Sequence, residues 1–332
     1  MPDGKGSRWI AVTNRRKEPE LLYGLTFRHN EEVSDRVDKR STSLELLATS
    51  GSLEVTRQRI EAGKHFNLYA ADEWVGFEFM YILSGLLLLE GTDGGETPIT
   101  VGDYFYHNGL REKAYFRVET DVELLIVCTP PSFHLIRDDM QEMMALARSV
   151  EEKDQTTDGH CSRLERLSIL MGERLGLPGE QLVAMSYGAY LHDIGKVMVP
   201  DQILGKTSPL TDAEWDEMRK HPDYGAEMLS EKEYLSGAAD IVRAHHERYD
   251  GAGYPRGLRE EEIPIGARVV AVVDTYDAIV SARPYKKGLG KEEAIRELEK
   301  NVGTQFDPRV VKAFVDLIRD ADDEKVDTTD AD

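Results

Sequence analysis

Histidines and aspartates in the second half of the chain are the residues best suited to chemistry. Five of the nine histidines lie beyond residue 150: His160, His192, His221, His245 and His246. Asp193 directly follows His192, and Asp274 stands in the apolar segment ARVVAVVDTYDA. Imidazole nitrogens and carboxylate oxygens are ligands that suit iron, manganese, zinc or nickel. These residues therefore predict a transition-metal site.

The spacing of apolar residues places two of these side chains on buried helix faces. His245 lies seven residues after Ala238, on the stripe that carries Ile241 and Val242. Asp274 lies seven residues after Ala267, on an equivalent stripe. A carboxylate on a buried face is unfavourable unless it is paired, hydrogen-bonded or bound to a metal. A single histidine on such a face is more often a hydrogen-bonded core residue, but several on separate helices favour a shared metal cluster.

Two different patterns of apolar residues along the chain indicate two domains. From Thr42 to Pro131 short β-like segments alternate with turn signals, which predicts a sandwich or barrel. From His134 onward the apolar residues recur at helical spacing. We therefore expect five parts: a polar N-terminal arm at 1–41, a β-barrel at 42–133, a linker helix at 134–153, an all-α domain at 154–319 and an acidic, solvated tail at 320–332.

Composition narrows the class of protein. A formal charge of −21 argues against a broad DNA-binding surface and against docking on anionic membranes. It also means that an anionic substrate needs local cations or metal ions at its site. No apolar run has the length of a membrane span, and no secretory signal is visible at the N-terminus. Two cysteines exclude a disulfide framework and fit a cytoplasmic location.

The second half, from Thr157 to Phe314, resembles the HD-GYP branch of the HD superfamily of phosphohydrolases. The strings that carry the resemblance occur in the family's order: TDGH (157–160), LHDIGK (191–196), VPDQIL (199–204), HPDYG (221–225), HHERYDGAGYP (245–255), VVDTYDAIVSARPYK (272–286) and GTQFDP (303–308). They cover nearly the whole half, so the resemblance is far more specific than a lone His-Asp pair.

The resemblance implies hydrolysis of cyclic di-GMP, to the linear dinucleotide pGpG or on to GMP. It also implies seven metal ligands: His160, His192, Asp193, His221, His245, His246 and Asp274. Asp193 would bridge two divalent ions, iron or manganese, that activate a hydroxide for in-line attack on phosphorus. Lys196 would face that hydroxide or a phosphate oxygen, and Arg283 and Lys286 would hold the substrate phosphates.

One departure from the family bears on the number of metals. Some members have a glutamate four residues before the first histidine, associated with a third ion. This chain has Thr156 there, so we expect two ions, although nearby Asp154 and Asp158 keep a third possible. The loop with Gly253, Tyr254 and Pro255 is implied to lie near the site or to contact a partner protein; a plain surface turn is the alternative.

The first half is similar to the cupin barrels, through GKHFNLYAADEWVGFEFMYILSG (63–85) and ITVGDYFYHN (99–108). The paired histidines of a cupin metal site are missing, and only His65 and His107 remain as candidates. The resemblance therefore implies a sensory or dimerising barrel, with a small-molecule ligand in its mouth. A structural barrel without a ligand is the alternative.

Three other functions remain open from the sequence. The enzyme could act on another cyclic dinucleotide such as cyclic GMP-AMP, or on a simpler phosphodiester. The domain could instead be an inactive module that binds a nucleotide or partner, although the complete ligand set argues against this. A nucleoside-monophosphate phosphatase fits less well. A homodimer could form through the linker helix, whose apolar positions are Leu135, Met140, Met143 and Met144.

Overall fold

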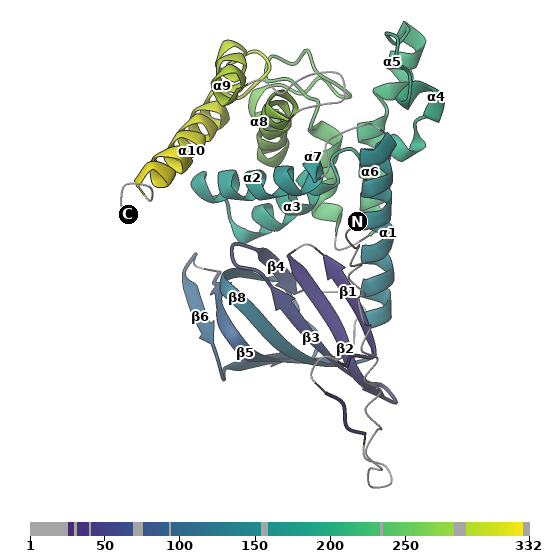
Figure 1. The fold of residues 1–332 in the computed structure, drawn as a ribbon, viewed down its shortest axis with the longest axis vertical. Helices are drawn as coiled ribbons and strands as arrows, with labels where there is room; N and C mark the ends of the chain where they lie inside the picture. Colours follow the sequence, from purple (N-terminus) through teal and green to yellow (C-terminus); the bar gives the residue numbers. More distant parts are fainter. Residues whose placement is uncertain are drawn as a thin grey trace, which may run out of the picture.

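The computed structural model of the chain describes residues 26–29, 32–39, 41–68, 76–92, 94–153, 159–232, 235–281 and 290–327. A curled β-sheet forms one end of the molecule and a group of helices the other (Figure 1). Helix α1 (Phe133–Lys153) runs alongside both parts and joins them. The expected fold class, a β-rich domain followed by an all-helical domain, is confirmed.

Eight antiparallel strands make up the sheet. They are β1 (Asp35–Lys39), β2 (Thr42–Ser50), β3 (Leu53–Ile60), β4 (His65–Leu68), β5 (Phe77–Glu90), β6 (Glu96–Thr100), β7 (Tyr104–His107) and β8 (Ala114–Thr129). The hydrogen-bonded order is β1-β2-β3-β8-β5-β6, while β4 pairs with β8 and β7 with β5. Among the described strands the pairing does not return from β6 to β1, so the sheet curls without closing by hydrogen bonds.

The long strands β5 and β8 bend where their register shifts, which lets one sheet enclose its own core. Alternate residues such as Met80, Ile82 and Leu124 point inward and are buried. At Gly85 the chain has φ 87°, and a Cβ there would lie 2.2 Å from the carbonyl oxygen of Asp121. Glycine is required at this close contact between the two strands.

The sheet begins earlier than expected. Strand β1 lies within the segment predicted as a polar arm, because Val37 is the only apolar residue among its charged neighbours and the periodicity is weak. In the structure Val37 packs with Leu44, Leu46 and Phe133, the first residue of α1. This small cluster attaches the sheet to the connecting helix.

The helical domain contains nine further α-helices among the described residues. They are α2 (His160–Arg174), α3 (Gly179–Tyr190), α4 (Asp201–Leu204), α5 (Asp212–Met218), α6 (His221–Ser230), α7 (Ser236–Ala244), α8 (Ile265–Val280), α9 (Lys291–Lys300) and α10 (Pro308–Asp327). Two short 3₁₀ helices, η1 (Ile194–Met198) and η3 (Glu260–Glu262), lie between them.

Helix α8 is the centre of this domain. Its residues Val269, Val270, Val272 and Val273 are fully buried among α2, α3, α9 and α10. A helix that is apolar on most sides must be covered on most sides, which explains why ARVVAVVDTYDA is enclosed. Asp274 is therefore carried by a helix whose neighbouring residues are buried in the core of the domain.

Helices α2 and α3 lie between the sheet and the rest of the helical domain (Figure 1). Helix α3 contacts strands β4 and β8. On the other side of the molecule, Met143 of α1 is buried against residues near η1 and α6, including Ile194 and Ala226. Met143, one of the positions proposed for a dimer contact, is therefore occupied within the chain.

The C-terminal helix continues into the segment predicted as a solvated acidic tail. Helix α10 ends at Asp327, and the remaining residues lie outside those described. None of the helices in the described ranges combines the length and the apolar character needed to cross a membrane.

Candidate metal centre

All seven predicted ligand residues converge on one site, and each comes from the end of a helix or from α8. His160 is the first residue of α2 and His221 the first of α6. The pair His192 and Asp193 follows the end of α3, and His245 caps the end of α7. His245 is 3% exposed, which confirms its predicted place on a buried face.

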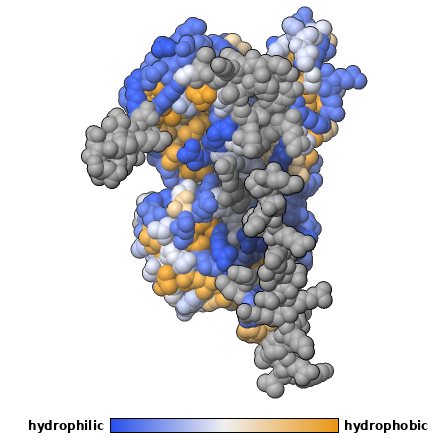
Figure 2. Space-filling view, viewed as in Figure 1, coloured by the Kyte–Doolittle hydropathy of each residue, from blue (hydrophilic) through white to orange (hydrophobic). Residues whose placement is uncertain are grey.

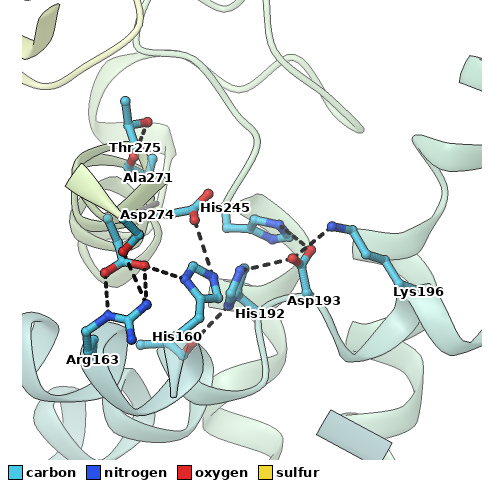
Figure 3. A network of polar contacts seen from close by, with 12 residues as sticks. His160, Arg163, His192, Asp193, Lys196, His245, Ala271, Asp274 and Thr275 are labelled. Carbon is cyan, nitrogen blue, oxygen red and sulfur yellow. Dashed lines mark hydrogen bonds and ion pairs between the residues drawn. The ribbon is translucent and has the colours of Figure 1, made fainter. Parts of the chain in front are cut away.

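The side chains form two groups that meet at the His192-Asp193 dipeptide. In one group the ligand atoms of Asp193, His221, His245 and His246 lie within 4.8 Å of one another; in the other, those of His160, His192 and Asp274 do. Asp193 Oδ1 lies 3.3 Å from His221 Nε2, and Asp193 Oδ2 lies 3.2 Å from His192 Nε2. The carboxylate of Asp193 therefore faces both groups (Figure 3).

The backbone orients three of the imidazole rings. In each case Nδ1 is bonded to the carbonyl oxygen three residues earlier: His192 to Ala189 at 3.0 Å, His221 to Met218 at 2.7 Å and His245 to Val242 at 2.6 Å. A carbonyl oxygen only accepts, so Nδ1 carries the proton and donates it. Nε2 is then left with its lone pair directed at the centre, as metal binding requires.

A carboxylate orients the fourth ring. His160 Nδ1 lies 2.7 Å from Asp277 Oδ2, and Arg163 donates to both oxygens of Asp277, at 2.7 and 2.9 Å. The two partners outweigh the opposing effect of burial and lower the pKa of Asp277 well below its usual range. Sequence reasoning missed Asp277 and Arg163. The available signal was the position of Asp277, three residues after Asp274 on the same helix.

The centre contains buried polar atoms that lack a partner within the described residues. Nε2 of His192 and Oδ1 of Asp193 are buried without a hydrogen-bond partner in the described part of the chain. Burial lowers the pKa of His192, but Asp193 outweighs it and raises the pKa to about 9. Burial and neighbouring imidazoles lower the pKa of His245 and of His246. Imidazoles around a carboxylate that has one oxygen without a partner in the described residues are a donor set that fits divalent transition metals.

Two motif glycines allow the elements to approach closely enough. A Cβ on Gly195 in η1 would lie 2.0 Å from the carbonyl oxygen of His221 and 2.4 Å from the nitrogen of Gly225. A Cβ on Gly225 would lie 2.8 Å from Val242 of α7. The glycines of LHDIGK and HPDYG thus fix the spacing between the segments that carry Asp193, His221 and His245.

The loop that contains Gly253, Tyr254 and Pro255, here called the GYP loop, lies against the site and is not a plain surface turn. The ring of Tyr254 lies 4.9 Å from that of His246, and burial, with Asp193 nearby, raises the pKa of Tyr254 to about 12. Buried Glu247 holds the loop by accepting hydrogen bonds from the backbone nitrogens of Arg256 and Leu258, at 2.7 and 3.1 Å. Glu247 directly follows the two histidines and was not singled out from the sequence.

Two cationic side chains lie close to the centre. Lys196 Nζ lies 2.9 Å from Asp193 Oδ2, as Figure 3 shows. The guanidinium of Arg219 lies over the rings of both Trp215 and Tyr254, at 5.8 and 5.9 Å from their centroids. Arg219 and Trp215 were not predicted, because an arginine among charged residues of an exposed helix carries no signal of its own.

Several predicted residues cannot be placed. Arg283 and Lys286, assigned to the substrate phosphates, lie outside the described residues, as do Thr156 and its acidic neighbours. In the sheet domain His65 and His107 do not come together: His65 faces Glu173 of α2, whereas His107 pairs with Glu78 at 3.0 Å. In the part of the chain that is described, metal-ligating groups of three or more occur in the helical domain alone.

Comparison with known proteins agrees with this geometry. The model of the HD domain family matches residues 143–310, which is half of the chain. The cyclic di-GMP phosphodiesterase response regulator RpfG of Xanthomonas campestris is 41% identical over 177 residues, covering 53% of this chain and 47% of that protein. The 3'3'-cGAMP-specific phosphodiesterase 2 of Vibrio cholerae is 35% identical over 173 residues, covering 52% and 33%. The chain thus spans about half or less of these relatives' length.

For the sheet domain, an RmlC-like cupin protein of Desulfovibrio desulfuricans is 20% identical, with a TM-score of 0.27, and covers 32% of this chain and 99% of that protein. For the helical domain, the family match, the order of the motifs and the convergence of seven ligand residues agree. The chain belongs to the HD domain family, and its motifs are those of the HD-GYP branch.

Proposed function

We propose that this protein is a metal-dependent phosphodiesterase that hydrolyses cyclic di-GMP to pGpG or GMP. One observation supports this most: two groups of imidazole and carboxylate ligands share the His192-Asp193 dipeptide, with the cation of Lys196 beside it. Adjacent metal pairs of this kind serve displacement at phosphorus. RpfG, 41% identical to this chain, is named a cyclic di-GMP phosphodiesterase, and the motifs agree with that substrate.

The seven candidate ligands and Lys196 would have separate roles in this reaction. Asp193, between the two groups, would hold two ions together, with His160, His192 and Asp274 on one side and His221, His245 and His246 on the other. When bound, two divalent ions supply activation of water and neutralisation of charge on the phosphoryl oxygens. Lys196 would bind a phosphoryl oxygen, since its ammonium already faces Asp193 at the edge of the centre.

Substrate binding would use cations outside the ligand set. Arg283 and Lys286 are proposed to hold the phosphates, as the family resemblance implies. Tyr254 would exclude water from one side, because its ring covers His246. We propose iron or manganese as the metals, since a nitrogen-rich site with carboxylates suits both, and a cytoplasmic setting, in which these ions and the substrate are available.

The test is turnover by the full-length protein, purified without oxygen, with its metals quantified in the same sample. We expect two ions per chain and accumulation of pGpG or GMP from cyclic di-GMP. Asp193→Ala should lose both metal and turnover, and Glu297→Gln on the exposed face of α9 should change neither. Full metal occupancy without turnover of any cyclic dinucleotide would contradict the proposal, as would an active Asp193→Ala protein.

A second candidate substrate is 3'3'-cyclic GMP-AMP. A relative 35% identical to this chain is named a phosphodiesterase specific for that nucleotide. Both nucleotides present the same phosphodiester ring to the metal centre, so selection depends on one base. Direct competition in a single reaction separates the two: equal concentrations of both nucleotides are supplied, and the ratio of their initial rates is the ratio of kcat/KM. A ratio above one for cyclic di-GMP supports the first candidate.

Two interactions are also proposed. The GYP loop, in which Gly253, Tyr254 and Pro255 are each partly exposed, could contact a protein partner. A homodimer could form through α1, where Met143 is excluded because it is buried within the chain. Sedimentation equilibrium of the purified protein at micromolar concentration tests the dimer directly.

A further inference from the structure

A cleft with a volume of about 590 Å³ lies between the sheet domain and the part of the helical domain formed by α2 and α3. Both domains line it: the sheet domain contributes His65, Leu88, Glu90, Gly94, Glu96, Tyr115, Phe116 and Arg117, and the helical domain contributes Glu173, Leu177, Gly179 and Leu182. This volume falls in the range of small-molecule sites. Figure 2 shows hydrophobic and hydrophilic surface side by side where the two parts of the molecule meet.

The lining carries an excess of negative charge. Three glutamates face one arginine, which gives a formal charge of −3 + 1 = −2 when His65 is neutral. Burial, aided by Arg117, lowers the pKa of His65 to about 4, so the ring is neutral at pH 7. Arg117 is already bonded to Glu96 at 3.0 Å and to Glu119. The cleft's own cation is thus committed to other carboxylates.

Among the described residues, neither Glu90 nor Glu173 has a hydrogen-bonded cation, but Glu90 accepts from the backbone nitrogen of Gly179, whereas no hydrogen bond to Glu173 is found. The basic group nearest to Glu173 is Nε2 of His65, at 3.8 Å. Burial raises the pKa of Glu173 even though Arg117 opposes this. The His65 side chain is only 4% exposed, and its Nδ1 has no hydrogen-bond partner in the ranges that the structure describes. A donor-rich cation in the cleft would satisfy the Glu173 carboxylate and approach the imidazole.

The remaining walls are apolar. Leu88 and Phe116 lie on the sheet side, and Leu177 and Leu182 on the helix side. Leu182 also belongs to the core of the helical domain. This lining favours a ligand that combines a positive group with an apolar body.

We propose that this cleft is a binding site for a small amphipathic amine, whose ammonium group pairs with Glu173 and whose apolar body packs between Phe116 and Leu182. Nothing in the catalytic proposal requires such a site, and binding at the cleft does not rest on that proposal. The class of ligand follows from the negative lining, the uncommitted carboxylate and the apolar walls.

The cleft is connected to the metal centre through the two helices that line it. Glu173 lies near the end of α2, about 20 Å along the helix from His160. Gly179 begins α3, which leads to His192 and Asp193, and its nitrogen donates to Glu90 of β5 at 2.8 Å. An occupant that moves α2 or α3 would shift metal ligands, and this regulatory part rests on the proposed function.

The first experiment measures binding alone, by calorimetry on the full-length, metal-loaded protein. The probes are phenethylamine and hexylamine, with phenylacetate as the anionic counterpart of matching size. We expect both amines to bind at least about tenfold more tightly than phenylacetate, since one charge-assisted contact is worth about that factor. Equal binding of amine and acid, or no saturable binding of either amine, would overturn the proposal.

Two variants place the ligand in the cleft. Glu173→Gln should weaken amine binding about tenfold or more and should not weaken the binding of phenylacetate, because it removes a repulsive carboxylate, while Glu297→Gln on α9 should change the binding of neither. Gly179→Ala adds a Cβ only 2.2 Å from Glu90 and 2.9 Å from Tyr115, so it should weaken binding without removing charge. Unaltered amine affinity in Glu173→Gln would place the amine elsewhere and overturn the assignment.

A turnover readout then separates the two proposals. Saturating phenethylamine should change the rate of dinucleotide hydrolysis in the unmodified protein and not in Glu173→Gln. If the protein binds the amine but hydrolyses no dinucleotide, the cleft stands and the catalytic proposal fails. If it hydrolyses the dinucleotide but binds no amine, the reverse holds.

Discussion

Replacing Asp277 by asparagine isolates the contribution of a residue that touches no metal. The carboxylate accepts from His160 Nδ1 on one side and from Arg163 on the other. An amide has one oxygen and one NH₂ group, so one of these donors must face the NH₂ group. The His160 ring then either rotates or loses the partner that sets its tautomer.

The structure sets the size of the effect. The His160 to Asp277 contact is short, at 2.7 Å, and the Asp277 side chain is 4% exposed. Loss of a carboxylate that orients a metal-bound histidine costs about 10- to 100-fold in metal affinity or activity. That range corresponds to about 1.4 to 2.7 kcal/mol. We expect the metal held by His160, His192 and Asp274 to be lost first.

Metal content after dialysis against a weak chelator, measured with turnover of cyclic di-GMP, is the assay. Asp320→Asn is the control, because Asp320 forms the same kind of pair with Arg174, at 2.8 Å, but is 60% exposed and remote from the centre. One ion retained and one lost in Asp277→Asn is the expected result. If Asp277→Asn keeps both ions and full activity, the inference that Asp277 positions His160 is wrong.

Three other predictions follow from single contacts. Gly195→Ala should lower metal content and turnover together, because its Cβ would lie 2.0 Å from the His221 carbonyl and must displace α6; elemental analysis and a rate assay test this. Arg219→Ala should raise KM several-fold with little change in metal content, because Arg219 lies over Tyr254 and is not one of the candidate ligands. Steady-state kinetics test this, and a fall in kcat instead of a rise in KM would mean that Arg219 takes part in the chemical step. Acidification from pH 6.5 to 4 should lower the free energy of unfolding by up to about 3 kcal/mol through His65. The pKa of His65 is about 4 in the folded protein and higher in the unfolded chain, so the unfolded chain takes up the proton first as the pH falls. His65→Asn should flatten that pH dependence in urea unfolding, measured with Lys64, Glu96, Arg117 and Glu173 unchanged.

The seven candidate ligand residues could be singled out from the sequence, two of them by their place on apolar stripes and the full set by the family resemblance. His245 and Asp274 stand on apolar stripes, and the histidine and aspartate strings are specific in type and order. The protein brings all seven together, as such patterns require. The residues that hold the candidate ligands and the GYP loop in place could not be predicted in the same way. Asp277, Arg163 and Glu247 act through contacts between segments far apart in the chain, and no local spacing encodes those contacts.

The sequence predicted a β-rich domain correctly, but it did not predict where the sheet begins. Alternating segments such as FEFMYILSG gave the strands, but β1 has one buried apolar residue, Val37, and its pairing with β2 depends on tertiary packing against Phe133. The cleft between the domains was also out of reach. His65 and Glu173 are 108 positions apart, and their proximity depends on how the sheet sits against α2.

The backbone bonds of the three imidazoles link metal retention to the local dynamics of helix ends. His192, His221 and His245 are each bonded to a carbonyl three residues earlier, and the carbonyls that hold His192 and His245 belong to the last turns of α3 and α7. Fraying of α3 or α7 by one turn would therefore remove the backbone partner of a ring that is proposed to hold an ion. Conversely, a bound ion would slow amide hydrogen exchange at those ends, and exchange rates there would report metal occupancy residue by residue.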